Sequence, residues 1–260
     1  MGTIPSNLKF LHCLRELEHL ISALIDGLML TDHEVTFSPT TNRNELEVLL
    51  DRVLPLLRGR LQSLGKPLES LDADRATVVF SGLGNMRNKV PMLCLTEVPK
   101  GKVLDSHRNL FGSFGLILKQ DWVMRNGADR VIYVGHNSSA SQQLFVCLAT
   151  MRILGLFVDK TGTLLFDNES IRPALGLLSF FETRDHLEET EWRIAGKTSF
   201  MGGGRETGKR IPLLLCDIEY IFAPNAEDVK RLAETVANLA VKQNTADPPK
   251  IIEFPSVVPE

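Results

Sequence analysis

Apolar residues recur at helical spacing in four stretches of the chain. Between Leu14 and Ile25 they fall at positions 14, 17, 20, 21, 24 and 25, which is the spacing of one helix face. Gly27 follows, where a helix C-cap would stand. Further helices are predicted over residues 44–64, with a break at Pro55, over 138–157, opened by Ser138, and over 226–241, capped by Asn225.

Short apolar and β-branched runs predict strands, most of them in the middle of the chain. The predicted strands cover residues 7–12, 77–80, 92–96, 114–119, 130–134, 192–195, 211–215, 219–222 and 251–254. Helices at both ends of a strand-rich middle favour an α+β fold with a mixed or antiparallel sheet. We predict a single domain over residues 1–242, and a polar linker with a short C-terminal strand over 243–260.

Composition and charge narrow the class of protein. The 260 residues are 43% hydrophobic and 23% charged, the mixture of an ordinary globular protein. The formal net charge of −3 gives no overall attraction to nucleic acid or anionic membrane, although a local basic patch stays open. The first nine residues show no signal-peptide pattern, and polar residues interrupt the longest apolar run, 144–158. We therefore expect a soluble, cytoplasmic protein.

The cysteines and histidines show no metal-binding pattern. Cys13, Cys94, Cys147 and Cys216 lie far apart in apolar stretches, so we expect all four to be buried, reduced thiols. The six histidines form neither an HExxH motif nor a close grouping with cysteine. No metal cofactor is expected.

A glycine-rich stretch, 203–209, has the GxxxxGK spacing of a phosphate-binding loop. Arg210 stands where such loops carry Ser or Thr, and a strand-like run follows where a helix should begin. A locally basic hairpin loop is the better interpretation. Its residues Arg205, Lys209 and Arg210 are candidates for contact with a phosphate or a nucleic-acid backbone.

Three segments between residues 9 and 193 carry a family resemblance. The first is Lys9-Phe10-Leu11-His12 with the leucines that follow and Asp26-Gly27. The second begins at Val90-Pro91-Met92-Leu93-Cys94-Leu95-Thr96-Glu97-Val98-Pro99. It continues through His107, Phe111-Gly112-Ser113-Phe114-Gly115, Lys119 and Trp122 to Arg130-Val131-Ile132-Tyr133. The third is Glu189-Thr190-Glu191-Trp192-Arg193. Together they resemble the abortive-phage-resistance AbiGi family. Three differences stand out: Phe111 replaces the family's usual Tyr, Cys13 and Leu14 replace Thr-like polar residues, and Glu97 replaces Asp.

An early histidine and a late Glu-x-Glu also resemble the ADP-ribosyltransferase superfamily. That resemblance implies NAD as substrate, with Glu191 on the NAD ribose and Glu189 positioning the acceptor, since alternate residues of a strand share a face. A carboxylate at this point would stabilise an oxocarbenium-like transition state. His12 would bond the adenosine-side ribose, a hydroxyl such as Thr96 or Ser113 would line the pocket, and Phe111 and Arg193 would complete it.

Each assignment has a structural alternative. His12 would equally cap a turn or satisfy a core carbonyl, and residues 188–191 would equally be a solvated acidic run. His107 would orient the adjoining loop or lie on a helix surface.

Three functions follow from these alternatives. The first is an NAD-dependent ADP-ribosyltransferase-like defence effector that modifies protein or nucleic acid. The second is a non-catalytic antitoxin that binds the product of a neighbouring gene. The third is a nucleic-acid-processing protein that uses the 205–210 loop.

Overall fold

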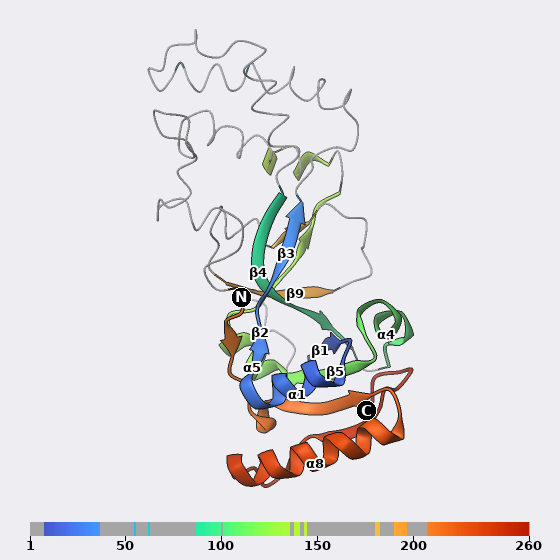
Figure 1. Ribbon diagram of the computed structural model, residues 1–260. Helices are drawn as coiled ribbons and strands as arrows, with labels where there is room; N and C mark the ends of the chain where they lie inside the picture. Colours follow the sequence, from blue (N-terminus) through green and yellow to red (C-terminus); the bar gives the residue numbers. More distant parts are fainter. Residues whose placement is uncertain are drawn as a thin grey trace.

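A computed structural model gives the fold (Figure 1). The structure describes residues 8–36, 87–99, 101–135, 138–140, 143–144, 180–182, 190–196 and 207–259, with Pro55 and Gln62 between them. Apart from Pro55 and Gln62, the helix predicted over 44–64 lies outside these residues, as do the strand over 77–80 and most of the helix over 138–157.

The described residues form an eight-stranded sheet, which with the helices packed on it confirms the predicted α+β class. Its order is β12-β11-β5-β1-β4-β9-β6, with β3 paired to β4. Only the β11–β12 pair is parallel among the described pairs of this sheet, so the sheet is mixed. The strands are β1 (Lys9–Leu14), β3 (Thr31–Thr36), β4 (Arg87–Glu97), β5 (Phe114–Lys119), β6 (Asp129–Arg130), β9 (Glu191–Ala195), β11 (Ile218–Ala223) and β12 (Lys250–Glu253).

Two short strand pairs accompany the sheet. Strand β2 (Leu28–Met29) pairs with β10 (Arg210–Ile211), and β7 (Ile132–Tyr133) pairs with β8 (Phe181–Glu182). The prediction of a strand over 211–215 was wrong beyond Ile211. Pro212 has no N–H for a ladder, and the Asp217 carboxylate accepts from the Leu214 N–H at 3.1 Å, so residues 215–217 form a 3-10 turn.

Four helices lie among the described residues: α1 (Leu17–Asp26), α4 (Asp105–Phe111), α5 (Gln120–Arg125) and α8 (Ala226–Gln243). The α1 prediction is confirmed, including its end at Gly27. The α8 prediction is confirmed too, because Asn225 Oδ1 accepts from the Asp228 N–H at 2.9 Å, the contact of an N-cap. None of the described helices is long and apolar enough to cross a membrane.

The sheet is buried on both faces, which explains the continuous apolar run of β5. Phe114, Leu116 and Leu118 face a core that includes Leu20 and Leu24 of α1, Trp122 and Val123 of α5, and Leu232 and Val236 of α8. Ile117 faces the opposite core, with Leu104, Phe222, Phe254 and Val258. In Figure 1, α8 lies along β11 and β12, and α1 lies near it.

The central strands β1 and β4 separate, and this separation positions the site. They pair only at Phe10↔Glu97 and Leu11↔Thr96. Beyond Leu11, β1 continues along β5 as far as Leu14, whereas β4 stays paired with β9 and β3. Residues that follow Leu11 therefore border a gap between two halves of one sheet.

The prediction of burial was wrong for the three cysteines that the structure describes, although all three are free thiols. Cys216 is exposed, and Cys13 and Cys94 are only half-buried. Cys216 lies in the 3-10 turn between the buried residues Leu215 and Asp217, which places its side chain outward. Cys147 lies outside the described residues.

Candidate functional site

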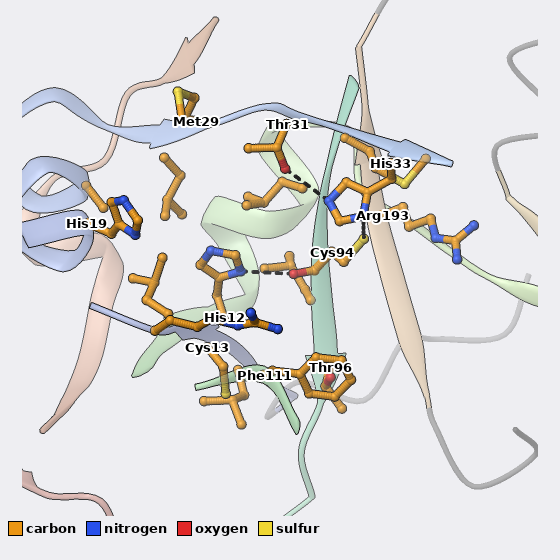
Figure 2. A pocket seen from close by; sticks show the side chains of 18 of the residues that line it. His12, Cys13, His19, Met29, Thr31, His33, Cys94, Thr96, Phe111 and Arg193 are labelled. Carbon is orange, nitrogen blue, oxygen red and sulfur yellow. Dashed lines mark hydrogen bonds between the residues drawn. The ribbon is translucent and has the colours of Figure 1, made fainter. Parts of the chain in front are cut away.

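A pocket of about 830 Å³ opens where β1 and β4 separate. Its lining comes mainly from β1, α1, β4 and the end of α4, with residues of β2, β3, β7, β9 and β10. Part of the lining is shown in Figure 2. Six of the predicted site residues line it together: His12, Thr96, Phe111, Glu191, Arg193 and Arg210. The volume is within the range of small-molecule and cofactor pockets.

His12 crosses the gap between the separating strands. Its Nδ1 lies 3.0 Å from the Cys94 carbonyl oxygen, as the dashed line in Figure 2 shows. A carbonyl only accepts, so Nδ1 carries the proton and Nε2 is the acceptor in the neutral ring. Burial lowers the pKa of His12, the bond to Cys94 opposes this, and His33 lowers the pKa further. His12 is therefore a neutral hydrogen-bond acceptor near pH 7.

Glu191 and Arg193 form a closed pair on the pocket side of β9. Arg193 Nε donates to Oε1 at 2.7 Å, and its second nitrogen donates to Oε2 at 3.0 Å. Tyr133 donates its hydroxyl to Oε2 at 3.1 Å. Arg193 is only 6% exposed, so this bidentate pair is held in a largely water-free setting.

Trp192 anchors this arrangement from the opposite face of β9. Its ring packs edge-on against Phe10 with the ring centroids 5.3 Å apart, and its Nε1 donates to Glu97 at 2.9 Å. Because side chains alternate along a strand, burying Trp192 in the core turns Glu191 and Arg193 toward the pocket.

Phe111 stands at the mouth of the pocket, at the end of α4, with 44% of its surface exposed. Gly112 follows with φ +135, and a Cβ there would lie 2.2 Å from the Leu14 carbonyl oxygen. This close approach fixes the end of α4 against β1. Ser113, the alternative pocket hydroxyl, does not line the pocket among the described residues, whereas Thr96 does.

Arg210 of the basic loop, a candidate for phosphate contact, binds the end of helix α1 in this structure. Arg210 donates to the Gly27 carbonyl at 2.9 Å and to the Ser22 hydroxyl at 2.8 Å. The guanidinium thus satisfies the C-terminal end of α1, where the helix dipole favours a cation. Lys209 is exposed, and its carbonyl accepts from the Leu30 N–H at 2.8 Å. Arg205 and Glu189 lie outside the described residues, so their roles stay predictions.

His107 is neither on a helix surface nor in the pocket lining. It is 5% exposed, and its Nε2 has no hydrogen-bond partner among the described residues. Burial lowers the pKa of His107, and Lys102 lowers it further. Its ring lies 5.9 Å from that of Phe111, which links this buried group to the mouth of the pocket.

Sequence reasoning missed several polar pocket residues, among them Arg15, His33, Cys94 and Tyr133. Tyr133 ends the second family-like segment, and that position was the available signal for it. His33 lies on β3, a strand that was not predicted, so nothing in the pattern placed it opposite Cys94.

The fold and the pocket define an α+β protein with a ligand-sized pocket between two separating strands. The chain belongs to a family described as "Putative abortive phage resistance protein AbiGi, antitoxin", whose sequence model matches residues 81–211. The match includes Glu191 and Arg193, whereas His12 precedes it. Family membership supports a role in abortive-infection defence. No curated protein matches the chain.

Proposed function

We propose that this defence protein binds NAD in the pocket and transfers ADP-ribose from it. The observation that supports this is the meeting of His12 and Glu191, from opposite ends of the chain, at one pocket of about 830 Å³. Had the two side chains bordered different surfaces, this chemistry would have no site.

In the proposed reaction, the bond between the ribose C1′ and the nicotinamide nitrogen breaks, and nicotinamide leaves with the electron pair. An oxygen or nitrogen of the acceptor bonds to C1′ and releases its proton. Glu191 stabilises the positive charge that develops on the ribose. Its Oε1 receives one hydrogen bond among the described residues, from Arg193, which leaves a lone pair for a ribose hydroxyl. His12 Nε2 accepts from the second ribose.

The test is nicotinamide release from NAD by the purified protein, alone and with cell lysate. Glu191→Gln removes the charge and is expected to abolish release. Glu16→Gln is the matched control, because Glu16 also lines the pocket, and its partner among the described residues is the exposed His19, at 3.7 Å. Thermal melts establish that both variants are folded.

Equal nicotinamide release from the wild type and from Glu191→Gln would rule out this role for Glu191. A labelled acceptor in the lysate would be identified as protein or nucleic acid.

A second function, binding a toxin without turnover, is favoured by one observation. The Glu191 carboxylate already receives three hydrogen bonds from Arg193 and Tyr133, which offset its charge. The family description names an antitoxin, so the partner would be the toxin encoded by a neighbouring gene. Co-expression and co-purification with that product test this function. A complex that survives Glu191→Gln, without nicotinamide release in any sample, would favour the antitoxin over the transferase.

A further inference from the structure

A cysteine–histidine pair lies within the pocket and takes no part in the proposed transfer. His33 Nδ1 is 4.0 Å from Cys94 Sγ, and both residues line the pocket. Figure 2 shows the His33 ring between Cys94 and Thr31, with a dashed contact to each. The described residues contain no group of three side chains placed to hold a metal ion, so we interpret the pair as a thiol with its base.

The second nitrogen of His33 also has a partner. Its Nε2 lies 3.0 Å from Thr31 Oγ1, a hydroxyl that can accept as well as donate. When both ring nitrogens are protonated, Nε2–H donates to Thr31 and Nδ1–H points to the sulfur of Cys94. The imidazolium–thiolate form of the pair is therefore supported at both ends, which is the arrangement that activates a cysteine nucleophile.

Among the described residues, neither of the other two cysteines has a hydrogen bond between its sulfur and a histidine ring. Cys13 lines the same pocket, but burial raises the pKa of its thiol to about 12. Cys216 is exposed, yet no histidine contact to its sulfur occurs among the described residues. One chain thus holds a half-buried thiol with a raised pKa, an exposed thiol and a thiol beside an imidazole, and these three can be compared with one another.

The charges around Cys94 do not oppose a thiolate. Its register partner on β9 is Arg193, whose charge is balanced by Glu191. On the β1 side stands His12, which its lowered pKa keeps neutral. On the β3 side stands His33, the group whose proton offsets the negative sulfur.

We propose that Cys94 is a reactive thiolate, activated by His33, and a covalent modification site for soft electrophiles and peroxides that enter the pocket. With an alkyl halide, the sulfur forms a bond to carbon, halide leaves, and the thiol proton stays on His33. With a peroxide, the sulfur is oxidised to sulfenic acid and the O–O bond is reduced to hydroxide or an alkoxide. The adduct would occupy part of the pocket that Cys94 and His12 both line.

The experiment measures iodoacetamide labelling of each cysteine in the native full chain, resolved by peptide mass spectrometry over a range of pH. An ordinary thiol is only a few per cent thiolate at pH 7, so stabilising the thiolate leaves room for a several-fold gain. We expect Cys94 to react at least about three-fold faster than Cys216 at pH 7, and Cys13 to stay unlabelled. We also expect the rate at Cys94 to reach half its maximum at a lower pH than that at Cys216.

Replacing His33 shows whether Cys94 reacts fast because His33 activates its thiol or because the thiol is accessible. His33→Asn is expected to slow labelling of Cys94 about three-fold or more and to move its half-maximal rate to higher pH. His19→Asn, another exposed pocket histidine with no thiol contact, is expected to leave the rate unchanged. If Cys94 reacts no faster than Cys216, or if His33→Asn and His19→Asn have equal effects, Cys94 is an ordinary thiol. Neither result depends on NAD binding, so this proposal and the transferase proposal fail separately.

Discussion

At the scale of single residues, the Glu191–Arg193 pair is the most sensitive point of the site. Both side chains are largely buried, with 16% and 7% of their surface exposed. Removing one member of a buried ion pair leaves an uncompensated charge, which costs about 3 kcal/mol or more. We therefore expect Arg193→Gln to lower the free energy of unfolding by about 3 kcal/mol, measured by chemical denaturation.

A double variant distinguishes pairing from packing in this prediction. Arg193→Gln with Glu191→Gln removes both charges and is expected to regain part of the lost stability, because no buried charge is left alone. If the double variant is instead less stable by the sum of both single losses, the two side chains act independently.

The sequence named Glu191 and Arg193 as candidates, and the strand periodicity that was applied to Glu189 and Glu191 holds for this pair as well. Glu191 and Arg193 stand two apart beside a tryptophan, and a strand turns such residues to one face. His12 was assigned to the same pocket by resemblance alone. Tyr133 and His33 escaped notice because they reach the pocket through β7 and β3, whose positions depend on long-range pairing rather than on local pattern.

At the scale of elements, Gly112 is the joint between α4 and β1. Its φ of +135 is a region reserved for glycine, and a side chain there would strike the Leu14 carbonyl. We expect Gly112→Ala to lower the free energy of unfolding by about 3 kcal/mol, combining backbone strain with a backbone clash.

Gly127 is the matched control for Gly112, because it has φ +72 but open space around its Cβ position. Gly127→Ala is expected to cost only about 1 kcal/mol. Equal losses in thermal or chemical denaturation would show that the close approach to Leu14 has no energetic weight.

The two longer described helices and strand β5 were predictable from local pattern, whereas the two short helices were not, for a physical reason. Helix α8 carries both an apolar stripe and the Asn225 cap, and β5 is an uninterrupted apolar run. Helices α4 and α5 have seven and six residues, too few for a helical period to stand out. They are held by tertiary contacts such as the bond from Trp122 Nε1 to the Pro212 carbonyl, 2.9 Å.

At the scale of the whole molecule, the separation of β1 from β4 connects fold and function. Both halves of the sheet are anchored by shared cores, which include Phe10 from β1 and Trp192 from β9. Between these anchors, the end of β1 reaches β4 through the contact between the His12 ring and the Cys94 carbonyl. The pocket thus arises where the backbone ladder is missing, and polar side chains replace it.

Among the described residues, the buried His107 and the half-buried His12 make the stability of the protein depend on pH. The pKa values of His12 and His107 are both lowered in the folded chain, mainly by burial. An unfolded histidine titrates near 6.5, so in the window just below that pH the unfolded chain binds more protons than the folded one. Stability is then fully present above about pH 6.5 and is lost as the pH falls through the lower folded values.

We therefore expect the melting temperature to fall between pH 7.5 and pH 5.5, and His107→Leu to reduce that fall. His107 Nε2 is buried without a partner among the described residues, so an apolar side chain of similar size removes the titration without sacrificing a hydrogen bond at that atom. At pH 7.5 the variant should melt at or near the wild-type temperature. His19→Leu, at an exposed position, is the control for a general effect of losing a histidine. A fall of the same size in His107→Leu and in the wild type would assign the pH dependence to other groups, with His12 the next to replace.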